Sequence, residues 1–236
     1  MKRNTFRRNP SHLSRLSAIA VLVTVQLTAT TCAASADEPP LDDYALDSYS
    51  RTIPTRGKVP CPVVELVRYR GSVIRYARPL TVHPAFRDRL EKFEQVVKEV
   101  AIEVYGRAPT RIAHLGSYNC RRIRRFPHLI SEHGLGNAID VAGFDFGRAP
   151  RGSKLPEGVP AKLARSFEVR MADHWNSRGK IGSVHARFLR LLARRLIARP
   201  DIFRVLLGPA WPGHDDHFHF DCADYRLIAI FEEDAG

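Results

Sequence analysis

The sequence predicts an α+β domain in which a small central antiparallel sheet is flanked by helices. Two stretches of the chain carry a helical hydrophobic repeat, and several shorter stretches between and after them alternate apolar and polar residues as strands do. No internal repeat is present in the 236 residues. Helices mixed with short, hairpin-like strands are typical of the α+β class.

The first 36 residues have the layout of a secretory signal peptide. They contain five basic and no acidic residues, and the apolar run SAIAVLVTVQLTA precedes a cleavage point expected after Ala36. This run is shorter than the ~20 residues that a helix needs to cross a bilayer, so no permanent membrane span is expected after cleavage. Retention of the segment as an anchor is the alternative. The expected location is periplasmic or secreted.

The charge of the chain narrows the choice of partner. Loss of residues 1–36 lowers the formal net charge from +12 to +7. A basic surface attracts polyanions, but an exported protein has little access to nucleic acid, so no nucleic-acid partner is expected. Peptidoglycan or another anionic envelope polymer is the expected partner, and a generically basic soluble protein is the alternative.

Residues 37–58 are polar and contain proline without an apolar period, which predicts a flexible lead-in to a domain spanning residues 59–236. The first long helix is expected within residues 83–106, with Pro84 in its first turn and Gly106 at its end. Its apolar stripe consists of Phe86, Leu90, Phe93, Val97, Val100 and Val104.

The second helix is expected over residues 184–198, with an apolar stripe and an arginine-rich face. That face is either solvated or able to hold an anionic polymer. Strands are expected near residues 111–118, 137–146, 166–172, 202–207 and 217–223.

Two short stretches carry residue types that bind metal ions. SEHGLGNAID, residues 131–140, contains His133 and Asp140, and GHDDHFHF, residues 213–220, contains three histidines. Alternate side chains of a strand share a face, so His217 and His219 point away from their phenylalanine neighbours, and Asp140 points away from Ile139 and Val141. If the two strands pair, these polar side chains converge on one surface. His133 can reach it across a turn that Gly134 and Gly136 permit.

Imidazole and carboxylate are ligands that zinc accepts, and a catalytic zinc uses three protein ligands. Four candidates therefore leave one polar group free to act as a base beside the metal. The spacing alone does not say which of the four is free.

At these residues the chain resembles a known group of enzymes. Ser131, His133, Gly136, Ala138 and Asp140 match the S-x-H-x-x-G-x-A-x-D pattern of the LAS zinc peptidases, and HFH resembles their second motif. GSYNCRR, LISEHGLGNAIDVAGF, VLLGP and HDDHFHFD together resemble the bacterial extensin-like C-terminal domain family, over roughly residues 61–225. The resemblance implies an LAS/hedgehog-type metallopeptidase fold.

The resemblance also assigns roles. It makes His133, Asp140 and His219 the Zn²⁺ ligands and His217 the catalytic base. Ser131 would support the ligand strand. Arg121, with Arg122 as the alternative, would hold the substrate. Asp216 occupies the position of the base in the carboxypeptidase branch and is the competing assignment, and His214 would orient water or substrate.

Three cysteines follow the signal peptide, namely Cys61, Cys120 and Cys222, which predicts one disulfide and one free thiol. Three pairings are possible. The family resemblance implies further cysteines in both long helices, and this chain lacks them. Cys120 with Cys222 is the favoured pair because both flank the predicted site.

Two functions are compatible with these observations. The first is a secreted or periplasmic zinc-dependent peptidase, of the D,D-carboxypeptidase or murein endopeptidase type, that hydrolyses peptide bonds in peptidoglycan stems. The second is a non-catalytic module that binds a cell-wall peptide or polysaccharide in the same pocket. The bond cleaved and the oligomeric state do not follow from the sequence.

Overall fold

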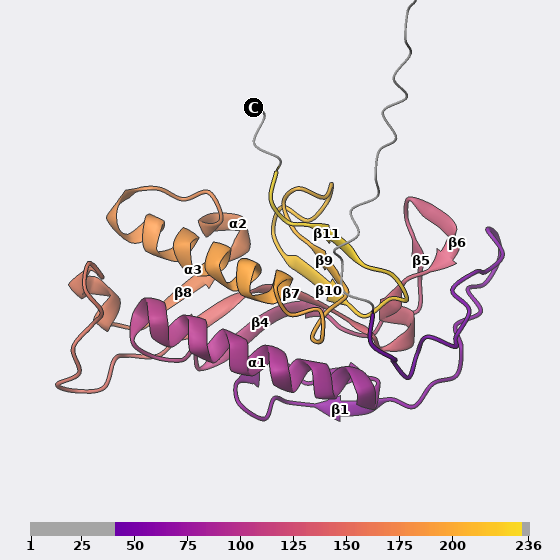
Figure 1. Ribbon diagram of the computed structural model, residues 1–236, viewed down its shortest axis with the longest axis horizontal. Coiled ribbons are helices and arrows are strands. Elements are labelled where there is room, and N and C mark those ends of the chain that lie inside the picture. The colour runs from indigo at the N-terminus through magenta and orange to yellow at the C-terminus, as the bar shows by residue number, and fades with distance from the viewer. Residues whose placement is uncertain (1–40, 233–236) are drawn as a thin grey trace, which may run out of the picture. The chain divides into compact units, whose positions relative to one another are not determined.

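The computed structural model describes residues 41–232, so the predicted signal peptide and the first residues of the lead-in lie outside the described part. Two long helices, α1 (Pro84–Tyr105) and α3 (Gly179–Ile197), and the short helix α2 (Met171–His174) accompany a seven-stranded sheet (Figure 1). No helix within residues 41–232 is both long and apolar enough to cross a membrane.

Helix α1 begins and ends where the sequence indicates. The His83 side chain accepts a hydrogen bond from the backbone N–H of Ala85, which satisfies one of the free donors of the first turn. Gly106 has φ of 73°, in the left-handed region that favours glycine, and its N–H bonds to the carbonyl of Ile102. The whole predicted apolar stripe is buried. Helix α3 begins five residues before the predicted start, at Gly179.

The sheet has the strand order β11-β9-β10-β7-β4-β2, and β8 pairs with the end of β7. Its strands are β2 (Arg75–Tyr76), β4 (Arg111–Gly116), β7 (Ala138–Phe146), β8 (Phe167–Arg170), β9 (Val205–Leu207), β10 (Phe218–Asp221) and β11 (Leu227–Ala229).

The sheet is mixed rather than wholly antiparallel, which corrects the prediction. The four pairs in its centre are antiparallel, but β2 runs parallel to β4 and β11 runs parallel to β9. Helix α1 lies between β2 and β4 in the chain, and a helical crossover of this kind returns the chain in the same direction. Both parallel pairs involve a short strand at an edge of the sheet, where alternation is too brief to reveal the pairing.

The main core lies on one face of this sheet, against α1 and α3. Phe220 of β10 lies 5.7 Å from Phe93 of α1, and Phe144 of β7 lies 5.2 Å from Phe188 of α3, as distances between ring centroids. All four side chains are fully buried.

Asp140 of β7 lies between the core residues Ile139 and Val141, and His219 of β10 lies between the core residues Phe218 and Phe220. Because adjacent side chains of a strand point to opposite faces, Asp140 and His219 lie on the face that the long helices leave uncovered. A register shift between Val141 and Gly143 returns Phe144 to the core side.

Residues 41–58 also contribute to the domain. Tyr44 and Leu46 belong to the main core, and Ile53 is buried. The backbone around Arg51 and Ile53 pairs with β6 (Phe126–Ile130), through two hydrogen bonds of 2.9 Å. The folded region therefore begins before Val59, because a few anchoring side chains and backbone pairing hold a segment that has no apolar period of its own.

The remaining elements are short and were not predicted. Strands β1 (Val67–Tyr69) and β3 (Leu80–Val82) form a two-stranded sheet, and β5 (Arg122–Ile123) forms a hairpin with β6. Two 3₁₀ helices span Glu132–Leu135 and Ala161–Ala164.

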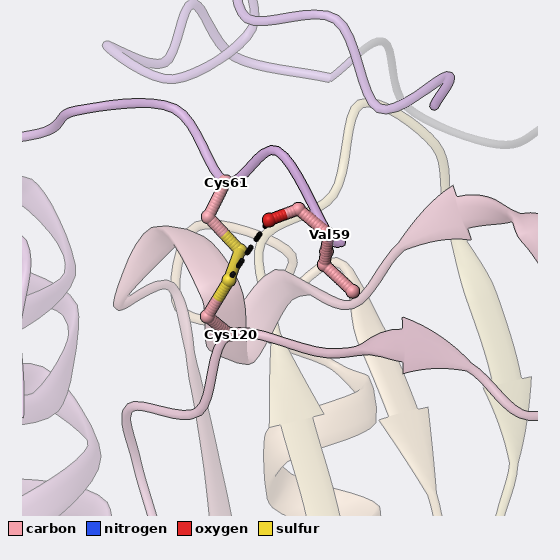
Figure 2. Close-up of a disulfide and its surroundings, with 3 residues drawn as sticks. All are labelled: Val59, Cys61 and Cys120. Atoms are coloured by element: carbon pink, nitrogen blue, oxygen red, sulfur yellow. Dashed lines mark hydrogen bonds between the residues drawn. A yellow bond between two sulfur atoms is a disulfide. The ribbon is translucent and has the colours of Figure 1, made fainter. Parts of the chain in front are cut away.

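The disulfide joins Cys61 to Cys120, so the favoured pairing of Cys120 with Cys222 was wrong (Figure 2). Cys222 is fully buried in the main core, where its thiol bonds to the carbonyl of Ile202 at 3.4 Å. Strand alternation accounts for this difference, because Cys222 shares the parity of Phe218 and Phe220 and so faces the core rather than the site.

Candidate metal centre

Strands β7 and β10 position two of the predicted metal ligands. The strands are antiparallel neighbours, and their register places Asp140 directly opposite His219. Directly opposed side chains on one face of an antiparallel pair lie about 5 Å apart at Cβ. The pairing proposed from the sequence is therefore the pairing found.

The third predicted ligand, His133, lies in the 3₁₀ helix Glu132–Leu135. This helix ends at Gly136, whose φ is 63°. A Cβ added at Gly136 would lie 2.5 Å from Leu66 and 2.9 Å from the backbone nitrogen of His83, so both the backbone conformation and the space require glycine. This turn brings His133 over the sheet.

Three ligand atoms face one another in this arrangement. Nε2 of His133 lies 3.2 Å from Oδ1 of Asp140 and 3.3 Å from Nδ1 of His219, and the last two atoms are 2.9 Å apart. His133 and His219 are buried, and Asp140 is half-buried. The three side chains form a group that could hold a metal ion.

The other nitrogen of each imidazole is occupied as well. Nδ1 of His133 lies 2.8 Å from the carbonyl oxygen of Ser117, and Nε2 of His219 lies 2.7 Å from Oδ2 of Asp221. Partners of this kind fix the orientation of a metal-binding ring. Sequence reasoning did not assign a role to Asp221, although it stands two residues after His219 and so shares its face of β10.

The electrostatics of the metal-free group favour an ionised Asp140 and a protonated His219 ring. Burial raises the pKa of Asp140, but hydrogen bonds and charge from His133 and His219 outweigh burial and hold that pKa far below its usual range. Burial lowers the pKa of His219, but hydrogen bonds to Asp140 and Asp221 raise it to about 9. A metal cation bound by His219 would therefore replace the proton that its Nδ1 shares with Asp140.

His217, the predicted base, stands immediately before β10. Its Nε2 lies 3.7 Å from Oδ1 of Asp140, and its Nδ1 lies 2.7 Å from Oδ1 of Asp216. The Asp216 side chain is 62% exposed, and its contact with His217 places it beside the predicted base. The structure thus places His217 next to the His133, Asp140 and His219 group, and it places Asp216 in contact with His217.

His214 and Ser131 also lie near the centre. The His214 ring is 4.8 Å from the His217 ring and 5.8 Å from the His219 ring. Burial, followed by the nearby His219 and His217, lowers the pKa of His214. Ser131 is buried at the start of the 3₁₀ helix, where its backbone accepts a hydrogen bond from Gly134 and donates one to Arg121.

A pocket of about 800 Å³ opens beside this group. His219, His214, Asp221 and Arg121 are among the residues that line it. Its other walls come from residues 47–52 and from the β5–β6 hairpin. Apolar side chains of β9, of β11 and of the loop after β9 complete it, namely Val205, Leu207, Leu227 and Trp211.

The two arginines considered for the substrate are separated by the structure. Arg121 is exposed and lines the pocket. Arg122 instead donates hydrogen bonds to the carbonyl oxygens of Pro54 and Arg56, at 2.8 and 3.0 Å, which holds residues 54–56 against the hairpin. Of the two, Arg121 is the one that faces the pocket.

Fold and site together define a mixed α and β domain whose sheet carries a His-Asp-His group able to hold a metal ion. The family model described as "Extensin-like protein C-terminus" matches residues 40–230. The chain belongs to this family. No curated protein and no solved structure matches the chain.

Proposed function

We propose that this protein is a zinc-dependent peptidase that hydrolyses peptide bonds in the stems of peptidoglycan, in the periplasm or outside the cell. The observation that supports this proposal most directly is the convergence of His133, Asp140 and His219 beside a pocket, with His217 next to them. Three ligands and one further base are what metal-assisted hydrolysis requires.

The donor set fits zinc. Two imidazole nitrogens and one carboxylate oxygen are ligands of catalytic zinc, and bonds of about 2.0–2.1 Å in a tetrahedron place ligand atoms about 3.3 Å apart. The three atom pairs measure 2.9, 3.2 and 3.3 Å, so little movement is needed to accommodate the ion. Zinc, when bound, would supply a Lewis acid that polarises a carbonyl and activates water.

His217 would accept the proton from an attacking water at Nε2. Asp216 accepts a hydrogen bond from Nδ1–H of that ring, which leaves the Nε2 lone pair directed to the ligand group. The neighbouring carboxylate also stabilises the charged ring that forms when the proton arrives. Arg121, from the pocket wall, would hold a substrate carboxylate.

The first experiment measures metal content and turnover together. Wild-type protein should bind about one zinc ion per chain, and His133→Ala and Asp140→Ala should lose it while keeping their circular dichroism. His217→Ala should keep zinc and lose turnover of purified muropeptides by about 100- to 10,000-fold, the usual contribution of general acid–base catalysis.

The alternatives give different outcomes. Equal zinc content in wild type, His133→Ala and Asp140→Ala would rule out the ligand assignment. Loss of zinc from His217→Ala would make His217 a ligand, and full activity of that variant would direct the test to Asp216→Ala. Zinc-dependent binding of muropeptides without any hydrolysis would identify a non-catalytic binding module.

A further inference from the structure

Two segments of the chain combine several basic residues with a complete absence of acidic ones. Residues 51–64 contain three basic residues and residues 115–131 contain four, and neither segment contains Asp or Glu. Other stretches, such as residues 174–200, also combine basic residues with an absence of acidic ones, and the two segments differ from that stretch because both contribute residues to the wall of the pocket beside the candidate metal centre.

The fold joins these segments into one surface. The disulfide between Cys61 and Cys120 links them covalently, and Sγ of Cys120 lies 3.8 Å from the carbonyl oxygen of Val59 (Figure 2). The N–H of Ile53 also donates to the carbonyl of His128 at 2.9 Å. The two segments, which are distant in sequence, are therefore held together.

Five of the seven cations are exposed to a ligand, and Arg122 also donates hydrogen bonds to two backbone carbonyl oxygens. Arg51 is half-buried and paired with Glu132, but none of the other six forms an ion pair within residues 41–232. Five of the six are exposed, and Arg122 is half-buried. We call this surface the basic lobe, and it consists of Arg56, Lys58, Arg121, Arg122, Arg124 and Arg125.

The basic lobe is continuous with the candidate site. Arg121 belongs to the lobe and also lines the pocket that contains His219. The guanidinium of Arg125 lies 5.7 Å from the centre of the Trp211 ring, which lines the same pocket. A polymer that lies along the lobe would thus present one of its units to the metal centre.

We propose that the basic lobe docks the carboxylate-bearing peptidoglycan polymer, by pairing with free carboxylates of stem peptides that neighbour the one in the pocket. This inference rests on the proposed function for the identity of the polymer. Five of the six cations are arginines, whose planar guanidinium matches a carboxylate in two parallel hydrogen bonds. The repeated negative charges of the polymer would meet cations that are not paired with acidic side chains of the protein.

The test is sedimentation of the zinc-loaded chain, from residue 37 onward, with peptidoglycan that has been freed of phosphate-containing polymers. The variant Arg56→Gln/Lys58→Gln/Arg124→Gln removes three charges that lie outside the pocket. It should bind about 10-fold more weakly at low salt, because each exposed ion pair contributes up to about 1 kcal/mol. Its binding should also depend less on salt, since exposed charges are screened by ions.

A matched control removes the same number and kind of charges elsewhere. Arg178, Lys180 and Arg187 are exposed at the start of α3, which lies apart from β5 and β6 in Figure 1. Replacement of these three residues by glutamine should leave binding within about twofold of wild type. Equal weakening by both triple variants would show that net charge alone drives binding and would overturn the proposal.

Further outcomes separate this proposal from the proposed function. If the variant Arg56→Gln/Lys58→Gln/Arg124→Gln bound peptidoglycan as tightly as the wild type, and the protein hydrolysed soluble muropeptides, only the docking surface would be overturned. Lobe-dependent binding without hydrolysis by the wild type would support the docking surface and contradict the peptidase. Lobe-dependent binding to anionic lipid vesicles, without binding to peptidoglycan, would overturn the choice of polymer.

Discussion

Asp221 holds the His219 ring on the side opposite Asp140. Oδ2 of Asp221 accepts from His219, and its Oδ1 accepts from the backbone N–H of Ala223 at 2.9 Å. Since both carboxylate oxygens are occupied and the side chain is buried, its position is fixed by the end of β10. A carboxylate in this place keeps a metal-binding ring oriented and raises its basicity.

We therefore expect Asp221→Ala to weaken zinc binding by about 10- to 100-fold, the usual effect of losing such a partner. Competition with a chromogenic chelator measures the affinity. Asp221→Asn, which retains an acceptor, should recover part of it, and Asp215→Ala, an exposed carboxylate of the preceding loop, should bind zinc as wild type does. Unchanged affinity in Asp221→Ala would show that the contact is only structural.

The protonation of His219 predicts the proton balance of metal binding. In the metal-free protein its pKa is raised to about 9, so the ring is protonated at neutral pH, and its Nδ1 must lose that proton to bind zinc. At about pH 7.5, binding should release about one proton, and the release should vanish above about pH 10. Calorimetry in buffers with different ionisation enthalpies measures this number. A value near zero at neutral pH would contradict the hydrogen-bonding pattern described for His219.

The grouping of His133, Asp140 and His219 was predictable from the sequence because local rules place these side chains. Alternation put His219 and Asp140 on the polar faces of their strands, and the glycine-rich turn explained His133. The same alternation pointed to Asp221, whose role was overlooked. The contact of Asp216 with His217 was not predictable, because β10 begins at Phe218 and the chain before it is not an extended strand.

At the scale of elements, residues 44–53 are tied to the helix that carries His133. Arg51 donates two hydrogen bonds to Glu132, at 2.8 and 3.2 Å, and two more to the carbonyl oxygens of Leu46 and Tyr49. Asn137 also donates to Glu132, at 2.6 Å. Burial raises the pKa of Glu132 despite these partners, so its charge depends on Arg51 for compensation.

Arg51→Ala should accordingly destabilise the protein by about 3 kcal/mol or more, since removing one member of a buried pair leaves the other charge uncompensated. Arg51→Ala combined with Glu132→Gln should be less destabilised than Arg51→Ala alone. Urea denaturation measures both. Arg122→Ala is the matched control, because Arg122 also holds the N-terminal segment but binds only neutral carbonyl groups. Equal losses in the two arginine variants would contradict a role for charge compensation.

Elements with a long hydrophobic repeat were predictable, and elements without one were not. The apolar stripes of α1 and α3 extend over several turns, which makes a helical period unmistakable. Strands such as β2 and β5 have two residues each and are defined by their partners rather than by their own sequence. Residues 41–58 likewise join the fold through contacts with distant segments, which their composition does not reveal.

At the scale of the whole molecule, two buried histidines have pKa values shifted in opposite directions, so they affect stability in different pH ranges. Burial, followed by the charge of His174, lowers the pKa of His185 to about 4. The His185 ring is buried at the junction of α1, α3 and β8, where Nδ1 lies 2.8 Å from the hydroxyl of Tyr105 and the ring stacks on Phe167. Because the His185 ring binds a proton more readily in the unfolded state than in the folded one, falling pH lowers the free energy of unfolding.

The metal-free protein should therefore be most stable near pH 6.5. His185 has a lowered folded-state pKa, so its contribution is complete above pH ~6.5 and is lost as the pH falls towards 4. His219 has a raised pKa, so its contribution is complete below pH ~6.5 and is lost as the pH rises through 9. Denaturation across this range measures both limbs.

His185→Gln tests the acid limb of that profile. The variant should be less stable than wild type at pH ~7, but it should lose about 1–3 kcal/mol less on going from pH 6.5 to pH 4, because no buried ring remains to be protonated. His83, His114 and His214 also have pKa values lowered by burial, so part of the acid limb should persist. His128→Gln, at an exposed position, should reproduce the wild-type slope. If His185→Gln showed the full wild-type slope, the acid sensitivity would lie elsewhere than in the junction of the two long helices with the sheet.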